Sequence, residues 1–284
     1  MKISKILQNK KSFSIEVFPP KKDGNIEQLY QTIMDIKYLK PDFISVTYGA
    51  GGSTRKNTEK IASYIKSNIG IEPMAHLTCI GSSIDELDKI ISEFKENNIE
   101  NILALRGDTP KEGDLKEGDF KHASDLVKYI SKKDFCIGIA CYPEKHPEAR
   151  TLEDDINYLK LKFDNGASFG ITQLFFDNKV FYNFIDKIEK IGINKPILAG
   201  IFIITNYNQL QKITEIAKPL LPETLKNNLE KYKDNQEVIK KIGIEFAINQ
   251  SLDLLKNGVK GLHFYIMNQK ESIIKIHEAI KNYL

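Results

Sequence analysis

The chain has 284 residues and a nearly balanced charge, with 41 Lys and Arg residues against 38 Asp and Glu residues and a formal net charge of +3. Its 41% hydrophobic and 28% charged residues are typical of a globular protein and exclude a disordered or fibrous chain. Phosphate binding needs clustered basic residues, so the balance also argues against a nucleic-acid partner.

The sequence shows no membrane span, secretory signal or disulfide framework. The longest apolar run, 197–204, contains a glycine and is far shorter than the roughly 20 residues of a membrane span. The basic N-terminus has no continuous apolar stretch. Cys79, Cys136 and Cys141 form no CxxC pair, and their odd number favours a reducing compartment. We therefore expect a cytoplasmic protein without a membrane partner.

Short β-prone runs alternate with helical patterns along the whole chain. We expect strands at 13–18, 42–47, 73–79, 101–106, 135–141, 169–174, 197–203 and 261–266. Between them, apolar residues recur at helical spacing, and Asn165-Gly166 and Asn257-Gly258 provide left-handed helix ends. Eight such units, in a length close to the usual ~250 residues, favour an α/β fold: one (β/α)8 TIM barrel domain over 1–284. A doubly wound open sheet is the alternative.

Two connections depart from the regular pattern. Residues 206–257, between the seventh and eighth strands, hold about three helical segments, with Pro219 and Pro222 between the first two. We expect extra helices beside the barrel rather than a second domain. The segment 108–120, after the fourth strand, contains the near-repeat KEGD and is either a solvated lid or a plain surface loop.

Polar residues occur at or near the C-terminal ends of six successive expected strands. Residues two apart share a face of a strand, and active sites of this barrel form at the C-terminal ends of its strands. The positions are Ser14 and Glu16, Ser45 and Thr47, His76 and Thr78, Arg106 and Asp108, Tyr142 on the face of Cys136, Gly138 and Ala140, and Gln173. This coincidence predicts a polar site at the mouth of the barrel.

Glu16 stands out because it lies within a strand that a barrel buries on both faces. One interpretation is a structural ion pair with Arg106. The other is a partly desolvated carboxylic acid with a raised pKa, which suits general-acid catalysis. Arg106-Gly107-Asp108 is likewise either a local ion pair or a site for a charged or heteroaromatic ligand. His76 is either a core histidine or a ligand contact.

Further candidates follow the fifth strand. His146 lies between two prolines in CYPEKHPEA (141–149), which favours a positioned ring. Asp155, Tyr158 and Lys162 form a stripe on one face of the next helix. The stripe is either a solvated face or a contact with a long cofactor.

Two common ligand signatures are weak or missing. The glycine-rich turn 48–52 is half of a dinucleotide fingerprint, because Thr54 stands where the third glycine would fall. A dinucleotide would therefore bind at the barrel mouth rather than in a Rossmann crevice. The spacing of the Cys and His residues predicts no metal site.

The chain resembles the methylenetetrahydrofolate reductase family, in its compact bacterial form, through seven segments in order: SIEVFPPK, SVTYGAGGS, AHLTC, LALRGD, CYPEKHPEA, GASFGITQLFFD and LHFYIMN. The resemblance covers essentially the whole chain. It implies an FAD-containing (β/α)8 barrel that reduces 5,10-methylenetetrahydrofolate to 5-methyltetrahydrofolate with NADH or NADPH, for methionine synthesis. It also implies a homo-oligomer and, because the chain ends at its last expected helix, no adenosylmethionine-sensing domain.

Matching positions imply roles for single residues. Glu16 matches the general acid, and Asp108 matches a carboxylate near the flavin and the pterin. Gln173 matches a side chain that contacts both substrates, and Gln209 matches a folate contact. The flavin-contacting positions correspond to Thr47, His76, Arg106, Gly107, Asp108, His122, Ala123, Tyr142, His146, Ala149, Asp155 and Lys162. The chain departs from relatives at His122, Tyr158, Leu161 and Gln269.

The implied chemistry needs an acid and an anion. Hydride passes from the nicotinamide to the flavin, and the folate then takes the same flavin face. The folate ring opens to a 5-iminium cation when N10 is protonated, the task of Glu16, and Asp108 stabilises that cation. The bridging carbon then receives the hydride.

Two other functions fit a polar barrel mouth. One is a flavin-free pterin-binding barrel that transfers methyl groups, and the other is a non-catalytic folate-binding subunit. FAD content separates the first from a reductase, and a turnover assay separates the second. No motif distinguishes NADH from NADPH as the donor.

Overall fold

Eight parallel strands form a closed barrel in the computed structural model, which describes residues 1–20, 24–48, 52–108 and 118–284 and, for 52–55, the backbone alone. Each strand pairs with the next in sequence, and β8 pairs with β1. The strands are β1 (Ser12–Val17), β2 (Phe43–Val46), β3 (Glu72–Thr78), β4 (Asn101–Leu105), β5 (Cys136–Cys141), β6 (Phe169–Thr172), β7 (Ile197–Phe202) and β8 (Gly261–Tyr265). The predicted (β/α)8 barrel is confirmed, and the alternative prediction of a doubly wound open sheet is wrong.

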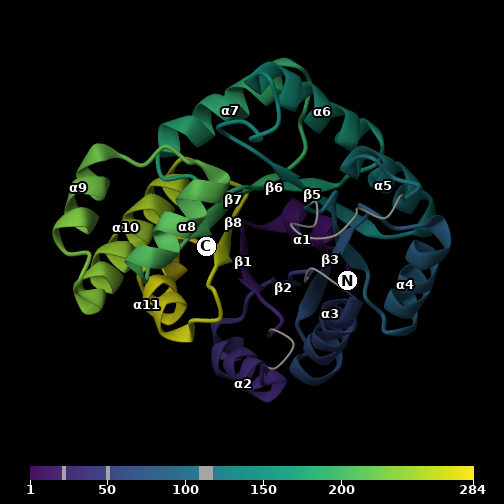
Figure 1. Ribbon diagram of the computed structural model, residues 1–284, viewed down its shortest axis with the longest axis horizontal. Helices are drawn as coiled ribbons and strands as arrows, with labels where there is room; N and C mark the ends of the chain where they lie inside the picture. Colours follow the sequence, from purple (N-terminus) through teal and green to yellow (C-terminus); the bar gives the residue numbers. More distant parts are fainter. Residues whose placement is uncertain (21–23, 49–51, 109–117) are drawn as a thin grey trace.

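Helices surround the strands (Figure 1). They are α1 (Ile3–Asn9), α2 (Ile26–Ile36), α3 (Gly52–Tyr64), α4 (Ile84–Glu96), α5 (Ala123–Ile130), α6 (Leu152–Asp164), α7 (Asn178–Lys190), α8 (Tyr207–Ala217), α9 (Glu223–Lys231), α10 (Gln236–Lys256) and α11 (Lys270–Ile280). In α4, a capping box of Ser83 and Glu86 starts the helix, and Leu87, Ile91 and Phe94 face the barrel as its apolar period predicts. Gly166 and Gly258 follow α6 and α10 with φ of 117° and 81°.

The predicted extra helices between the last two strands are α8, α9 and α10. Pro219 and Pro222 lie between α8 and α9, as expected from the sequence. Gly243 brings α10 close to the segment after β7, because a Cβ there would lie 1.8 Å from the carbonyl oxygen of Ile204. This close approach fixes α10 against the barrel, with α9 outside it (Figure 1).

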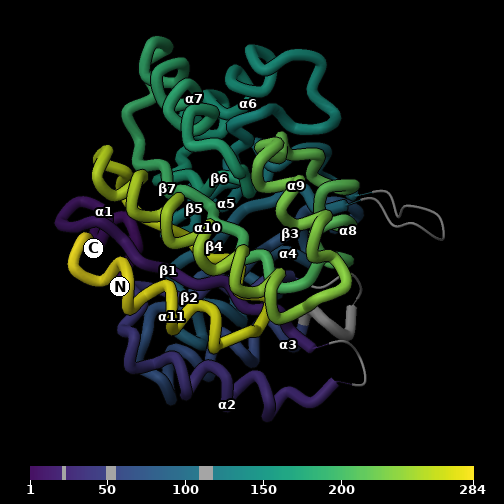
Figure 2. Tube along the Cα trace, turned by 90° about the vertical axis from the view of Figure 1, so that its left-hand side faces the viewer, coloured from purple at the N-terminus to yellow at the C-terminus, as the bar shows by residue number. Residues whose placement is uncertain are grey.

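The N-terminal half of the barrel interior is apolar and is closed by α1. Ile3 and Leu7 of α1 are buried among inward side chains of six strands: Phe43, Met74, Leu103, Cys136, Phe169, Ile171 and Leu198. Figure 2 shows α1 and both chain ends on one side and α8 and α9 on the opposite side. Polar chemistry is therefore left to the C-terminal half of the barrel.

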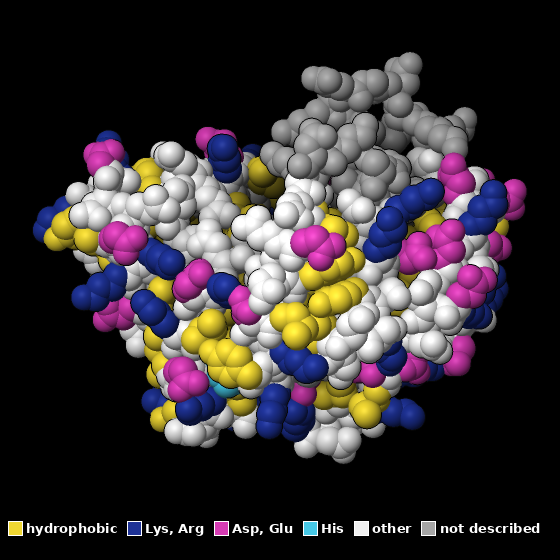
Figure 3. All heavy atoms as spheres, turned by 90° about the horizontal axis from the view of Figure 1, so that it is seen from below, with side chains coloured by type: hydrophobic (Ala, Val, Ile, Leu, Met, Phe, Trp, Pro, Cys, Tyr) yellow, Lys and Arg dark blue, Asp and Glu magenta, His cyan; other side chains and the backbone are white. Residues whose placement is uncertain are grey.

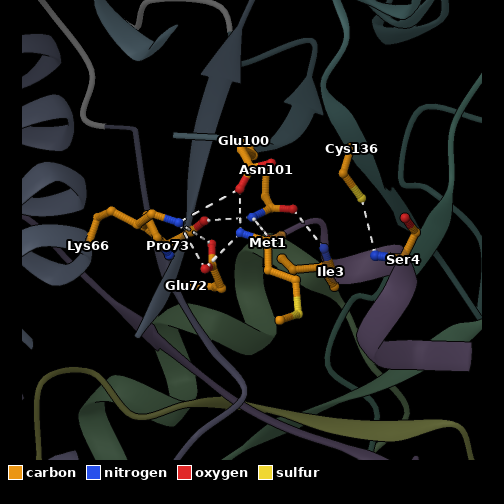
Figure 4. A network of polar contacts seen from close by, with 9 residues as sticks. All are labelled: Met1, Ile3, Ser4, Lys66, Glu72, Pro73, Glu100, Asn101 and Cys136. Atoms are coloured by element: carbon orange, nitrogen blue, oxygen red, sulfur yellow. Dashed lines mark hydrogen bonds and ion pairs between the residues drawn. The ribbon is translucent and has the colours of Figure 1, made fainter. Parts of the chain in front are cut away.

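A polar network holds α1 in place (Figure 4). Asn101, at the start of β4, accepts a hydrogen bond from the N–H of Ile3 at 2.8 Å and donates to the carbonyl oxygens of Met1 and Pro73. The amino group of Met1 forms ion pairs with Glu72 and Glu100. The buried amide of Asn101 thus satisfies backbone groups that the barrel end would otherwise leave unpaired.

The described surface mixes both signs of charge. On the face shown in Figure 3, Lys and Arg side chains alternate with Asp and Glu side chains. Within the ranges given above, no helix is both long and apolar enough to cross a bilayer. Most of the expected lid or loop at 108–120 and the centre of the glycine-rich turn 48–52 lie outside the described residues.

Candidate active site

The centre of the site is the buried carboxylate of Glu16 on β1, which is only 6% exposed. Its Oε2 lies 3.3 Å from Nε2 of His76 on β3 and 3.4 Å from Nε2 of His263 on β8. Glu16 does not pair with Arg106, so the interpretation of Glu16 as the partner of Arg106 in a structural ion pair is wrong. Closure of the barrel pairs β8 with β1, with Ser14 in register with His263 and Glu16 in register with Tyr265. His263 is therefore one inward position away from the partner of Glu16 and reaches its carboxylate.

The expected rise of the Glu16 pKa is also wrong. Burial alone raises the pKa of Glu16, but hydrogen bonds and charge interactions with His263 and His76 outweigh it and lower the pKa to about 2. In this structure the carboxyl group is therefore ionised at neutral pH, with two imidazoles beside one oxygen. Any acid chemistry at Glu16 needs a proton supplied by its neighbours.

Two serines orient the imidazoles. Ser14 Oγ lies 2.8 Å from Nδ1 of His263 and donates to the carbonyl oxygen of Leu262 at 3.1 Å. Ser45 Oγ lies 2.6 Å from Nε2 of His76. A hydroxyl has one proton, so a Ser14 that donates to Leu262 accepts from Nδ1 of His263. Nε2 of His263 then faces Glu16 Oε2 at 3.4 Å, and a hydrogen bond between these two atoms requires that the pair hold one proton between them.

Tyr265 of β8 lies across the mouth beside Glu16. Its hydroxyl donates to the carbonyl oxygen of Thr172 on β6 at 2.7 Å. This placement depends on Gly200 of β7, where a Cβ would lie 2.2 Å from the Thr172 oxygen and 2.8 Å from the Tyr265 ring. Burial raises the pKa of Tyr265, and the neighbouring Glu16 adds to the rise, so the phenol stays neutral.

Arg106, Gly107 and Asp108 follow β4, which ends one residue earlier than predicted. The Arg106 guanidinium forms a bidentate ion pair with Glu148, in which Nη1 lies 2.5 Å from Oε2 and Nη2 lies 2.8 Å from Oε1. Gly107 has a φ of 89° and lies against β3, where a Cβ would be 3.0 Å from Cβ of Thr78. Asp108 is exposed, and its negative charge acts on Arg106 and Tyr142.

The loop after β5 orients His146. Its backbone N–H donates to Asp155 Oδ2 of α6 at 2.8 Å, and its ring nitrogen Nδ1 accepts from the N–H of Glu148 at 3.1 Å. Burial lowers the pKa of His146, so the ring is neutral with its proton on Nε2. The Tyr142 ring packs edge-on against it at 4.7 Å.

Lys162 of α6 places a half-buried ammonium group beside this loop. Its Nζ donates to the carbonyl oxygen of Ala140 at 2.7 Å, and burial lowers its pKa. An ammonium group has three donors, and Ala140 is the acceptor found among the described residues. The group therefore suits a ligand with several oxygen or nitrogen acceptors, such as a flavin.

The remaining predicted residues lie at the same end of the barrel and form no hydrogen bond or ion pair with Glu16 in the described part of the chain. Thr47 and Gln173 directly follow β2 and β6, His122 is the N-cap of α5 and Ala123 its first residue, Ala149 lies in the loop before α6, and Gln209 lies in the first turn of α8. Tyr158 and Leu161 on α6 are 60% and 44% exposed. The predicted stripe thus divides: Asp155 and Lys162 turn inward, while Tyr158 faces solvent.

Three residues of the site were not predicted individually. His263 and Tyr265 lie in LHFYIMN and alternate with the buried Leu262 and Phe264. The same alternation that indicated Glu16 and His76 would have identified them. No alternation in the sequence indicates Glu148, because it lies in a loop and only the shape of that loop brings it to Arg106. In the described ranges no cluster of His, Cys, Asp and Glu side chains is placed to hold a metal ion.

Comparison with known proteins gives a consistent family. The family model described as "Methylenetetrahydrofolate reductase" matches residues 2–281. The chain is 38% identical to "Methylenetetrahydrofolate reductase (NADH) 1" of Arabidopsis thaliana, over 95% of this chain and 48% of the relative. It is 37% identical to "5,10-methylenetetrahydrofolate reductase" of Escherichia coli, over 93% and 89% of the two chains. The chain thus spans about half the length of its plant relative and most of the bacterial one.

Solved structures share the fold. A protein from Clostridium thermocellum, described as binding two copies of 5-methyl-5,6,7,8-tetrahydrofolic acid, superposes with a TM-score of 0.67 at 14% identity, over 99% of this chain and 98% of that one. Oxaloacetate acetylhydrolase superposes with a TM-score of 0.54 at 11% identity, over 98% and 83% of the two chains. At these identities the likeness concerns the barrel alone.

Proposed function

The chain belongs to the methylenetetrahydrofolate reductase family, and on that premise we propose that it reduces 5,10-methylenetetrahydrofolate to 5-methyltetrahydrofolate at the barrel mouth. The observation that carries the proposal is the Glu16 carboxylate, buried at the mouth between the imidazoles of His76 and His263. Both contacts are made to the same oxygen, Oε2, and both partners are titratable imidazoles. Two ionisable partners on one oxygen form a group that can store and release a proton.

Glu16 acts in this proposal as the last member of a proton-holding cluster. The proton that His263 Nε2 and Glu16 hold between them is passed by the carboxyl group to N10 of the folate. Because the proton lies between two buried groups, it stays at the site until the folate takes it. His76 lies on the other side of the same oxygen and stabilises the anion that is left behind.

Asp108 supplies the negative charge that the opened folate needs. Protonation of N10 lets the five-membered ring open to a 5-iminium cation, and an anion beside that cation lowers its energy. Asp108 is exposed at the end of β4, next to Arg106 and Tyr142, where a substrate can reach it. We assign Gln173 and Gln209 to folate binding from their places after β6 and β7.

We propose FAD as the bound cofactor. The residues fit it, since Lys162 offers half-buried donors, His146 offers its Nε2–H and Arg106 offers a fixed cation at one side of the mouth. When bound, FAD would accept a hydride from the nicotinamide and return it to the folate carbon. NADH is the donor that we propose, because the plant relative is named for it.

A steady-state assay tests the proposal. Without oxygen, purified protein with FAD should oxidise more than one equivalent of NADH only when 5,10-methylenetetrahydrofolate is present, and 5-methyltetrahydrofolate should form continuously as NADH is consumed. Methyl transfer without NADH consumption would favour a flavin-free methyltransferase barrel instead. Folate binding without turnover would favour a non-catalytic subunit.

A further inference from the structure

Residues 142–149 fold into two consecutive turns of the same form, Tyr-Pro-Glu-Lys followed by His-Pro-Glu-Ala. The N–H of Lys145 donates to the carbonyl oxygen of Tyr142 at 3.2 Å, and the N–H of Ala149 donates to that of His146 at 3.0 Å. Proline at the second position of each turn fixes its φ where such turns need it. We call this segment the double turn.

The third residue of each turn binds a different part of the site. Glu148 forms the ion pair with Arg106 after β4. Glu144 accepts a hydrogen bond from the backbone N–H of Leu220, in the segment between α8 and α9, at 2.9 Å. The double turn therefore connects two sides of the barrel mouth, and its shape sets where His146 and Ala149 lie.

Lys145 joins the two turns in a backbone conformation that favours glycine. Its φ is 107°, a region that other residues adopt only where the surroundings fix it. Its side chain folds back over the second turn, where Nζ donates to the carbonyl oxygens of His146 and Ala149 at 3.3 and 2.5 Å. These carbonyl groups belong to the first and last residues of that turn. The ammonium group thus clamps the turn that carries His146.

We propose that Lys145 is a positioning residue for the cofactor, holding the double turn in the shape that binds FAD. The inference rests on the proposed function. The backbone of Lys145 is strained, yet its side chain stabilises the turn that follows it. This combination indicates that the shape of the loop, rather than its stability, is what the residue serves. Glycine would relieve the strain but could not hold the two carbonyl groups.

Two substitutions separate the effects of strain and charge. In Lys145→Gly the strain and the ammonium group both disappear, whereas in Lys145→Met the strain stays and the ammonium group is lost. Lys160→Met on α6, an exposed lysine with a local Asp164 partner, is the matched control. Flavin fluorescence on serial dilution of the holoprotein gives the FAD dissociation constant, and thermal unfolding of FAD-stripped protein gives the stability.

We expect the dissociation constant of FAD to rise about tenfold in both Lys145 variants, which corresponds to about 1.4 kcal/mol. The melting temperature should fall in Lys145→Met but be kept or raised in Lys145→Gly. A merely structural role would make affinity and melting temperature change together. A Lys145→Gly protein that binds FAD within about twofold of wild type would overturn the inference alone. A wild-type protein that holds no FAD would overturn the proposed function as well.

Discussion

The Oε2 atom of Glu16 lies 3.4 Å from Nε2 of His263, across the junction where the last strand of the barrel meets the first. The two residues are 247 positions apart in sequence, and closure of the barrel alone makes them neighbours. Ser14 holds the far side of the imidazole. The pair is therefore a rigid, buried site for one proton at the mouth of the barrel.

Glu16→Gln should separate the two halves of the reaction. Glutamine keeps the shape of the side chain but cannot transfer a proton, so the folate should fail to reoxidise the reduced flavin. Reduction of the flavin by NADH should stay within a few-fold of wild type, because it needs no proton from Glu16. Anaerobic stopped-flow absorbance measures each half separately, and the NADH half is the internal control. Unchanged folate turnover in this variant would refute the assignment of the acid.

Ionised Glu16 should also contribute to stability in a pH-dependent way. The pKa of Glu16 is lowered from 4.5 to about 2 in the folded protein, so the unfolded chain takes up the proton more readily. The contribution is fully present above about pH 4.5 and is lost as the pH falls towards 2. We expect urea unfolding midpoints of wild type to fall more steeply across this range than those of Glu16→Gln. Parallel curves for the two proteins would contradict the lowered pKa.

His263→Gln should change the pH profile of the folate half-reaction. The variant keeps a donor beside Glu16 but removes the imidazole that holds the proton with it. We expect the rate to drop by about two orders of magnitude, at the lower end of the range of about 10²–10⁴ that acid–base groups contribute, and its pH dependence to move. Rates of the folate half-reaction measured between pH 5 and 9 test this. A wild-type profile at a uniformly lower rate would show that His263 only supports the fold.

Asp108→Asn should slow the folate half-reaction more than the NADH half-reaction. The asparagine is nearly isosteric but cannot stabilise the iminium cation. Loss of one such electrostatic contact costs about 10²–10³ in rate at most, and exposure of Asp108 places the expectation at the lower end. Asp164→Asn, on the exposed side of α6, is the control and should leave both halves unchanged. Equal slowing of the two halves in Asp108→Asn would argue against the role in cation stabilisation.

Gly200→Ala should destabilise the barrel at its mouth. The added methyl group would lie 2.2 Å from the carbonyl oxygen of Thr172, which is backbone and cannot move freely, and 2.8 Å from the Tyr265 ring. Overpacking of this kind costs about 1–3 kcal/mol. Urea unfolding monitored by circular dichroism measures the change in free energy. A variant as stable as wild type would mean that Tyr265 does not occupy the space above Gly200.

The barrel could be predicted because its pattern is local. Each strand and helix leaves its own period in the sequence, so the order of elements and the helices between β7 and β8 followed from it. Alternation along strands also indicated Glu16 and His76. The partners of Glu16 could not be predicted from local pattern, because they depend on which strands become neighbours when the barrel closes.

The wrong expectation for the Glu16 pKa has the same origin. Burial alone raises the pKa of a carboxyl group, and the sequence indicated burial. The two imidazoles that reverse the shift come from β3 and β8, and one of them was not recognised as a site residue. The ion pair of Arg106 with Glu148 could not be predicted either. Glu148 lies on the double turn, and a loop of this kind has no periodic pattern in the sequence.

The visible absorption spectrum of the purified protein tests the central claim most directly: that the barrel mouth binds FAD and uses it between NADH and the folate. The protein should be yellow, lose its flavin band when NADH is added without oxygen, and regain the band when 5,10-methylenetetrahydrofolate follows. A protein that stays colourless after incubation with FAD, or a bleached band that the folate does not restore, would contradict the account.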